Sequence, residues 1–283
     1  MRGMAHRLLG GLSPSSFLRR HWQKRPLFVR NAIPHCGSWL HRETLFDLAC
    51  RDDVESRIVT RAGNRWRVAD GPFTQSRLQR MPARNWTLLV QGVEQFLPDA
   101  AALLQQFSFI PHARLDDLMV SYAAPGGGVG PHFDSYDVFL LQGDGTRRWR
   151  IGAQKDLTLI DDAPLRLLKN FRSRQAWDVA TGDLLYLPPR YAHDGVATAS
   201  CMTLSVGFRA PLKQELAAHF LDYLQDNLRI DGMIEDAGLP LQAHPAHPFS
   251  PSGIRVAAET VCGCMACPAS AASFLRECPI GSA

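Results

Sequence analysis

Two histidines and one aspartate in this sequence have the types and spacing of a metal site. His132 and Asp134 form a His-x-Asp pair in PGGGVGPHFD, and His193 follows 61 residues later (193 − 132) in YLPPRYAHDG. Side chains two positions apart in an extended strand point to the same side, so His132 and Asp134 can bind one ion together. Two imidazoles and one carboxylate form the facial triad of non-haem Fe(II) oxygenases, which leaves the other coordination positions open. The three residues therefore predict a catalytic iron site.

The sequence around these residues strengthens that interpretation. A bare His-x-Asp pair often occurs by chance on a surface strand or as a hydrogen-bonded core group. Here a glycine-rich loop precedes the pair, and residues 134–152 predict a β-hairpin with its turn at 143–146. GDLLYLPP reads as an apolar strand that ends at two prolines, which cannot donate to a sheet. We therefore expect His193 just beyond a strand end.

Iron with three open positions needs a co-substrate that supplies electrons, and 2-oxoglutarate is the usual one. Its distal carboxylate needs a cation, for which the planar guanidinium of arginine is well suited. In RRWRIG, residues Arg147, Trp149 and Ile151 share one strand face, whereas Arg148 and Arg150 share the other. We predict that Arg147 points inward and binds this carboxylate. The alternative is that Arg147 and Arg148 are both solvated hairpin charges.

Two neighbouring strands could supply the rest of a pocket. In DDLMVSYAAP, Asp117 and Ser121 lie on one face, so Ser121 can hydrogen-bond the distal carboxylate and Asp117 can hold a cationic substrate group. Equally, Ser121 could be a small filler and Asp117 a strand-start cap. Behind His193, the strand CMTLSVGF places Thr203 and Ser205 on one small polar face, a second candidate lining of the pocket.

The remaining pattern places these strands among helices and further strands. We predict helices at 16–23, 43–50 and 95–107, strands at 27–31 and 87–93, a hairpin with arms 56–60 and 65–69, a barrel over 112–210, and a helix within 212–230.

Several of these segments resemble a known family. They are similar to the bacterial ribosomal oxygenases of the JmjC group within the cupin superfamily. The similar segments are the stretch from DDLMVSYAAP through DVFLLQGDGTRRWRIG, the later GDLLYLPPRYAHDG and LSVGFRAP, and the upstream HWQKRPLFVRNA and NWTLLVQGV. The resemblance covers about residues 13–232. It implies a mainly β fold with flanking helices (α+β), a double-stranded β-helix or jelly roll.

The resemblance also implies a function. The cofactors would be Fe(II) and 2-oxoglutarate, and the reaction the hydroxylation of an arginine side chain in ribosomal protein sixteen of the large subunit. Carried over by position, iron ligation falls on His132, Asp134 and His193, 2-oxoglutarate binding on Ser121 and Arg147, and contacts to the substrate arginine on Asp117 and Tyr136. Two alternatives stay open: an Fe(II) oxygenase acting on a histidyl or lysyl side chain or a small molecule, and a non-catalytic cupin-like binding module.

Three segments are expected along the chain. Residues 1–210 would form the oxygenase domain with its N-terminal helical and strand extension, and residues 211–236 a helical segment. The helix carries an apolar stripe of Leu216, Phe220, Leu221, Leu224 and Leu228. The stripe fits packing on the same domain or, as the resemblance implies, a homodimer interface.

The last segment, residues 237–283, departs from the family pattern. Only four of its 47 residues are Asp, Glu, Lys or Arg, and it holds four of the seven cysteines, at positions 262, 264, 267 and 278. It does not resemble the winged-helix domain that family members carry at this point. Because the cysteine spacing is irregular for zinc, a weakly ordered tail is favoured over a metal site.

Composition limits the remaining choices. A chain of 283 residues with 46% hydrophobic composition can bury a full core. The net charge of +4, without a block of five like charges, argues for neither nucleic-acid nor membrane binding. The N-terminus lacks the apolar segment of a signal peptide, and no stretch reaches the roughly 18 apolar residues of a membrane span. We therefore expect a cytoplasmic protein whose partner is a ribosomal protein of the large subunit.

Overall fold

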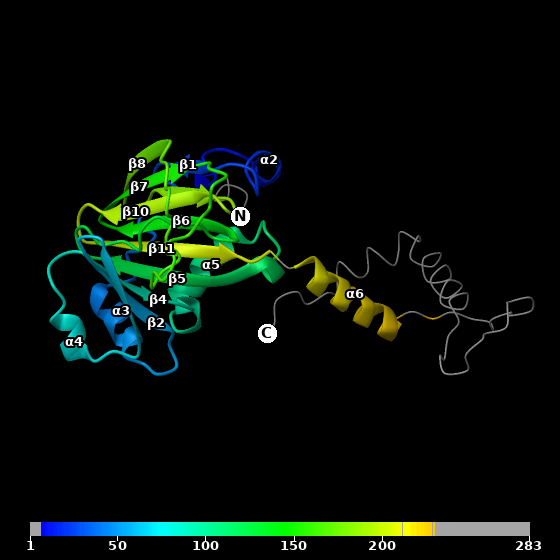
Figure 1. Cartoon of the computed structure of the whole chain (residues 1–283). Helices are drawn as coiled ribbons and strands as arrows, with labels where there is room; N and C mark the ends of the chain where they lie inside the picture. The colour runs from blue at the N-terminus through cyan, green and yellow to red at the C-terminus, as the bar shows by residue number, and fades with distance from the viewer. Residues whose placement is uncertain (1–6, 211, 228, 230–283) are drawn as a thin grey trace, which may run out of the picture. The chain divides into compact units, whose positions relative to one another are not determined.

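The computed structural model describes residues 7–210, 212–227 and 229 (Figure 1). The chain divides into two compact units, Met1–Ala210 and Pro211–Ala283. The first unit is mainly β with a few helices, and two antiparallel sheets face each other across its interior. This arrangement is the jelly roll that the sequence predicts.

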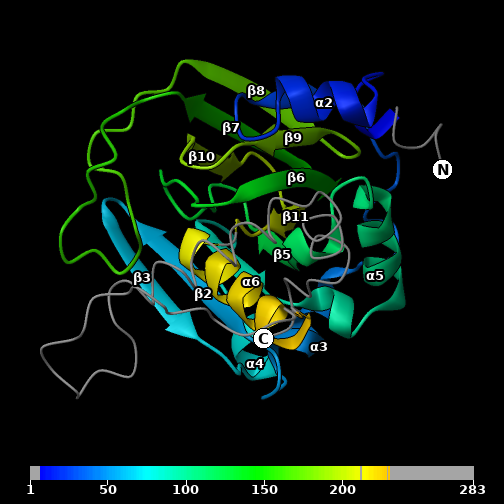
Figure 2. The same ribbon diagram turned by 90° about the vertical axis from the view of Figure 1, so that its right-hand side faces the viewer.

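The larger sheet has eight strands. Their spatial order is β1 (Leu27–Val29), β9 (Leu184–Leu187), β6 (Asp137–Asp144), β11 (Cys201–Phe208), β5 (Leu115–Ala123), β4 (Trp86–Val90), β2 (Ser56–Ala62) and β3 (Arg65–Asp70). The smaller sheet has the order β10 (Ala192–Ala197), β7 (Thr146–Gly152) and β8 (Gln175–Ala180). In the side view of Figure 2, β8, β7 and β10 form one layer and β6, β11 and β5 the other.

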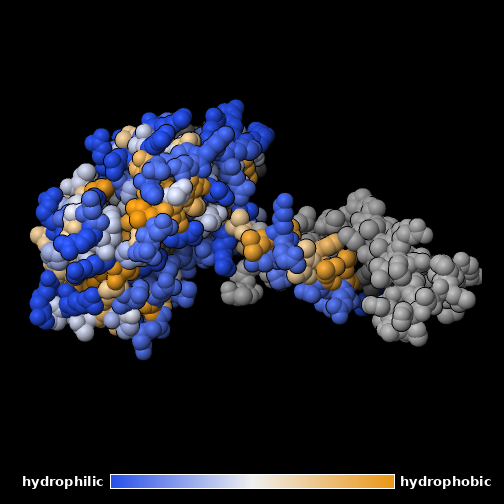
Figure 3. Space-filling model, viewed as in Figure 1, coloured by the Kyte–Doolittle hydropathy of each residue, from blue (hydrophilic) through white to orange (hydrophobic). Residues whose placement is uncertain are grey.

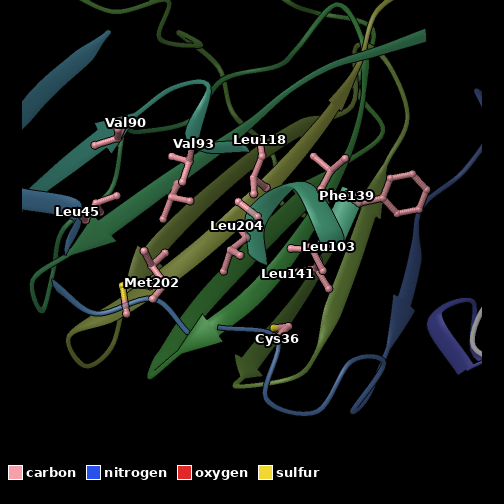
Figure 4. Packing of buried hydrophobic residues seen from close by; sticks show 14 of the residues in the cluster. Cys36, Leu45, Val90, Val93, Leu103, Leu118, Phe139, Leu141, Met202 and Leu204 are labelled. Carbon is pink, nitrogen blue, oxygen red and sulfur yellow. The ribbon is translucent and has the colours of Figure 1, made fainter. Parts of the chain in front are cut away.

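Strands β6, β9 and β11 of the larger sheet are buried on both faces, which explains their nearly continuous apolar sequences, whereas the edge strand β3 is partly exposed. In β6, Phe139 and Leu141 join one core cluster, whereas Val138 and Leu140 join another. The first cluster lies under the helices and includes Leu103 of helix α5 (Pro98–Leu104) (Figure 4). The second fills one end of the space between the sheets. The alternation of each strand therefore divides its side chains between a helix-covered core and the interior of the jelly roll.

Short helices cover the outer face of the larger sheet. They are α2 (Pro14–Arg20), α3 (Arg42–Ala49), α4 (Gln75–Gln79) and α5 (Pro98–Leu104), with 3₁₀ turns η1 (Val93–Gln95), η2 (Gln105–Phe107) and η3 (His112–Arg114). The single helix predicted at 95–107 is wrong, because Pro98 starts α5 and disfavours helical geometry at the residue before it. Leu97 is accordingly extended, with φ −122° and ψ 116°.

The hairpin predicted over 134–152 is also wrong. Strands β6 and β7 follow each other in the chain but belong to different sheets, so they do not pair. The connection runs through Gly145, whose φ is +64° and whose missing side chain would lie 2.0 Å from the carbonyl oxygen of Ser200. Glycine permits both the left-handed conformation and this close approach. The same turn residues that predict a hairpin therefore carry the chain from one sheet to the other.

The N-terminal strands are part of the larger sheet and do not form a separate extension. Strands β2 and β3 form the predicted hairpin, which runs further than expected and turns at Gly63 and Asn64. Strand β2 pairs with β4, and β4 pairs with β5, so the N-terminal strands continue the large sheet. The predicted barrel boundary at residue 112 is therefore too late for the sheet as a whole. Figure 3 shows the mostly hydrophilic outer surface of this unit, interrupted by small hydrophobic patches.

The described part of the second unit is essentially helix α6 (Lys213–Asn227). Leu221 is 65% exposed and Leu216 is 38% exposed, whereas Leu224 is buried. Leu228 and the cysteine-containing segment 237–283 lie outside the described residues. None of the helices that the structure describes combines the length and the apolar composition that a membrane span requires.

Candidate metal and cosubstrate site

A cavity of about 310 Å³ lies between the two sheets. Strands β5 and β11 line one wall mostly with polar or small residues at alternate positions, and β6 adds Val138 and Leu140 to it. Strands β7 and β10 line the opposite wall. The predicted lining residues Thr203 and Ser205 both face this cavity. The outward residues of the same strands, such as Leu204 and Val206, are in the helix-covered core. Strand alternation therefore keeps polar groups in the cavity without placing them in the core.

His132, Asp134 and His193 come together at the cavity wall. Their candidate ligand atoms all lie within 4.8 Å of one another. The Nε2 atom of His193 is 3.5 Å from Oδ2 of Asp134, and Nε2 of His132 is 4.0 Å from Oδ1 of the same carboxylate. Among the described residues this is the one group of three or more such side chains with metal-ligand spacing.

Backbone pairing holds the two histidines side by side. The amide of His132 donates to the carbonyl of His193 at 2.9 Å, and the reverse bond is 2.8 Å. His193 lies beyond the end of β9, as predicted, and it is also the second residue of the next strand, β10. His132 and Asp134 precede β6 in an extended loop instead of lying in a regular strand. Because that segment is still extended, the two side chains reach the same side as predicted.

Hydrogen bonds orient both imidazoles. Nδ1 of His132 lies 2.9 Å from the Gly130 carbonyl, and Nδ1 of His193 lies 2.8 Å from the Tyr191 carbonyl. A carbonyl only accepts, so each Nδ1 carries the proton and each Nε2 is free to bind an ion. Burial lowers the pKa of His193 to about 4, and the charge of His132 adds to this effect. His193 is therefore neutral near pH 7, as a metal ligand must be.

Arg147 and Ser121 meet in another part of the cavity, since Arg147 lies four residues along β7 from Ile151, the residue that pairs with His193. Arg147 is 4% exposed, and its Nη2 donates to Oγ of Ser121 at 3.4 Å. The burial of β7 alternates, with Arg147, Trp149 and Ile151 buried and Arg148 and Arg150 exposed. The predicted face assignment of this strand is confirmed. In the described structure, Nε of Arg147 is buried without a hydrogen-bond partner.

Asp117 and Tyr136 line another part of the cavity. A side chain at Gly207 would lie 3.7 Å from Oδ1 of Asp117 and 3.6 Å from the Tyr136 ring, so both groups face that glycine. Burial raises the pKa of Asp117 to about 6, the Gly92 amide lowers it, and the negative charges of Asp116, Glu94 and Glu55 raise it further. Burial likewise raises the pKa of Tyr136, which leaves its phenol protonated.

Sequence reasoning missed the part of the cavity that comes from the N-terminal strands. Arg57 of β2 and Thr87 and Leu89 of β4 line it, as do Leu165 and Arg166 from the loop between β7 and β8. Thr87 is fully buried, and its hydroxyl has no partner among the residues described. The polar residues Thr87 and Gln91 in WTLLVQ are four positions apart and therefore share one strand face, a signal that β4 turns polar groups to an interior.

The donor groups fit a metal and an anion. Two imidazoles and a carboxylate match the facial triad of Fe(II), with the cavity on their open side. Across the cavity, a buried guanidinium with an unpartnered nitrogen and a serine hydroxyl match a carboxylate. The cavity can therefore hold an iron ion and a dicarboxylate that spans the space between the two groups.

Comparisons with known proteins agree with this geometry. The JmjC domain family matches residues 102–216. Over 231 residues, the chain is 39% identical to the ribosomal protein uL16 3-hydroxylase of Escherichia coli strain K12; the match covers 81% of this chain and 61% of that protein. The chain thus spans less than two thirds of that curated relative.

Solved structures are similar over a larger share. An X-ray structure of E. coli YcfD has a TM-score of 0.73 at 36% identity and covers 92% of this chain and 69% of that one. A structure of the same ribosomal oxygenase in complex with cobalt and 2-oxoglutarate has a TM-score of 0.71 at 36% identity, with coverage of 92% and 68%.

Proposed function

Because the chain belongs to the JmjC-domain family of ribosomal oxygenases, we propose that it is an Fe(II)- and 2-oxoglutarate-dependent oxygenase. One observation carries this proposal: the His132, Asp134 and His193 group faces a buried arginine, Arg147, across a single cavity. A cupin-like module that only binds a metal has no need for this second, anion-binding side. The pairing therefore favours an oxygenase over a binding module.

Each side of the cavity has its own role in this proposal. His132, Asp134 and His193 would hold iron, which would couple oxygen activation to the oxidative decarboxylation of 2-oxoglutarate into succinate and carbon dioxide, with one atom of O2 entering succinate and the other entering the product. Arg147 and Ser121 bind the distal carboxylate of 2-oxoglutarate by charge-assisted hydrogen bonds. The apolar ring of Trp149, which lies 5.8 Å from the His193 ring, keeps water from this part of the site.

The substrate we propose is an arginine side chain of the large-subunit ribosomal protein uL16. Asp117 would hold the guanidinium, and Tyr136 would pack beside the aliphatic part of the side chain. Hydroxylation of an unactivated methylene depends on positioning, and a carboxylate matched to the guanidinium supplies it. A ribosomal protein substrate would place the enzyme in the cytoplasm. The exposed leucines of α6 favour a homodimer.

The experiment is a mass-spectrometric assay. The full chain, loaded anaerobically with Fe(II) and 2-oxoglutarate, is mixed with oxygen and peptides that together cover the arginines of uL16. We expect one peptide to gain one oxygen atom on arginine, and its arginine-to-lysine version to be a poor substrate because ammonium lacks the planar fork. Oxygen on histidine, or equal hydroxylation of the lysine peptide, would favour a histidyl or lysyl oxygenase. No decarboxylation of 2-oxoglutarate would favour the binding module.

A further inference from the structure

A second arginine lines the cavity from a strand that contributes none of the residues discussed above. Arg57 lies on β2, where it pairs in register with Leu89 of β4, and Leu89 pairs with Ser121 of β5. Residues in register across neighbouring strands share a sheet face, so Arg57 and Ser121 face the same interior. The two strand spacings between them amount to roughly 10 Å. Arg57 thus approaches the cavity from the side, away from the Ser121 and Arg147 pair.

The guanidinium of Arg57 lacks a partner that would explain its position. Its Nε is buried without a hydrogen bond in the part of the chain that the structure describes. No carboxylate there lies within 4.0 Å of its nitrogens; Asp70, its cross-strand neighbour, is exposed and unpaired with it. A buried unpaired donor is unfavourable, and native structures seldom keep one without a ligand or water. The other cavity arginine with an unpartnered Nε is Arg147, for which a carboxylate ligand is proposed.

The surroundings of Arg57 are those of the substrate side. Asp117 and Tyr136 line the same cavity. Burial and the negative charges of Asp134, Asp117 and Asp116 raise the pKa of the Tyr136 phenol. The positive charge of Arg57 acts on the same phenol and lowers its pKa. The acidic groups Glu55, Glu94, Asp116 and Asp117 gather on this side. The substrate side therefore presents a carboxylate for a cation and, separately, a guanidinium that can only donate hydrogen bonds.

We infer that Arg57 binds a main-chain carbonyl oxygen of the substrate next to the modified residue. The inference rests on the proposed function and extends it to the substrate class. Asp117 takes the cationic end of the side chain, so Arg57, itself a cation, must take an acceptor at another point of the substrate. A peptide segment offers such acceptors on both sides of the modified residue. Arg57 thereby positions an arginine within a polypeptide instead of a free guanidine compound.

The first test compares Arg57→Ala and Arg57→Lys with Arg67→Ala, an exposed arginine of the same hairpin on the opposite face. Binding of a fluorescent uL16 peptide is measured by anisotropy under anaerobic conditions with Fe(II) and 2-oxoglutarate. We expect Arg57→Ala to weaken peptide binding by about ten-fold or more, the effect of one charge-assisted hydrogen bond. Arg57→Lys should lie between it and the parent, and Arg67→Ala should equal the parent. The concentration of 2-oxoglutarate needed for peptide-independent decarboxylation should stay unchanged, which also shows that the variants are folded.

The second test is a double-mutant cycle with two modified peptides. In each peptide an E-alkene replaces one amide next to the modified arginine, which removes one carbonyl without adding charge. If Arg57 binds that carbonyl, the substitution and the alkene together should cost no more than either alone. Fully additive losses of binding free energy with both peptides would overturn the inference. A higher 2-oxoglutarate requirement in Arg57→Ala would also overturn it and would assign Arg57 to binding of the cosubstrate. A parent protein that neither binds nor hydroxylates any uL16 peptide would instead overturn the proposed function, and the inference with it.

Discussion

At the scale of single residues, the site depends on which side chains the strands turn inward. The three metal-ligand candidates differ in exposure: His193 is 3% exposed, whereas His132 and Asp134 are 22% and 23% exposed. Solvent therefore reaches the metal position from the loop side and not from β10. This asymmetry leaves an entry path for an ion or a substrate while one ligand stays fixed in the sheet.

The first prediction concerns Asp134. Replacing it with alanine removes the sole carboxylate of the triad, and two neutral imidazoles alone neither balance the ion's charge nor complete the three-ligand set. Asp134→Ala should lose stoichiometric iron binding and 2-oxoglutarate turnover, as measured by metal analysis and succinate formation. Asp161→Ala, in an exposed loop, is the matched control and should behave like the parent. If Asp134→Ala decarboxylates 2-oxoglutarate at the parent rate, the metal assignment is wrong.

The second prediction separates two adjacent arginines. Arg147 is buried beside Ser121, whereas the side chain of Arg148 is 57% exposed. Charge-assisted hydrogen bonds are worth about 1.5 to 3 kcal/mol, which corresponds to roughly ten-fold to more than hundred-fold in affinity. Arg147→Ala should raise the 2-oxoglutarate concentration needed for half-maximal turnover by a factor in this range, and Arg148→Ala should leave it unchanged. Equal effects in a titration of succinate formation would contradict the proposed role of Arg147.

The third prediction is a pH dependence of substrate binding. Burial raises the pKa of Asp117 to about 6. A carboxyl group with a raised pKa is ionised above that value and gains a proton below it, so it can pair with a guanidinium only above about pH 6. The charged or titratable groups near it are Asp116, Glu94, Glu55, Tyr136 and Arg57.

Binding of an arginine peptide should therefore weaken as the pH falls through 6. Asp117→Asn should bind weakly at every pH and lose this dependence, while iron and 2-oxoglutarate binding persist. Anaerobic anisotropy titrations between about pH 5 and 8 measure both effects. Because the pKa is raised in the folded protein, the ionised Asp117 carboxylate destabilises the folded state at pH values above the ordinary pKa of a carboxyl group. Asp117→Asn should therefore not lower the unfolding midpoint at pH 8. A peptide affinity in the parent that is flat across pH 6 would contradict the assignment.

At the scale of elements, strand alternation and the local hairpin of β2 and β3 were predictable, whereas pairings between strands distant in the chain were not. The inward positions of β7, β5 and β11 follow from a period of two, which a local sequence window contains. The pairing of β6 with β9 and β11, and not with its neighbour β7, depends on contacts far apart in the chain. Turn residues such as Gly145 indicate a reversal of direction but not whether the chain stays in one sheet. Arg57 and Thr87 were missed for the same reason, because their strands join the cavity through distant pairings.

The fourth prediction concerns the packing of β10 on β7. Gly195 of β10 lies over the indole of Trp149, and a Cβ at this position would be 2.6 Å from the ring. Gly195→Ala must displace either the strand or the ring, and such overpacking typically costs about 1 to 3 kcal/mol. Urea unfolding should show this loss. Gly207→Ala is the control for stability, since a Cβ there would make only ordinary contacts from 3.6 Å. Equal stability of Gly195→Ala and the parent would show that the two strands are not packed as closely as described.

At the scale of the whole molecule, the cavity and helix α6 belong to different units. Every cavity-lining residue comes from Met1–Ala210. In the second unit, Leu216 and Leu221 of helix α6 are exposed, as is Leu212 directly before the helix. Leucines exposed on a helix are commonly covered by a partner, and the apolar stripe predicted from the sequence runs through two of these three. Assembly and catalysis should therefore respond to different substitutions.

The last prediction tests this separation in the full chain. If α6 forms a homodimer interface, the parent should sediment as a dimer at micromolar concentration. The double variant Leu216→Glu with Leu221→Glu should be a monomer, because charges buried in an apolar contact are strongly unfavourable. Iron binding and peptide-independent 2-oxoglutarate turnover should not change, since no cavity residue is altered. Gln214→Glu with Gln225→Glu, at exposed polar positions of the same helix, adds the same charge and should stay dimeric. A parent that is monomeric at every concentration, or a leucine variant that remains dimeric, would show that these leucines do not join two copies.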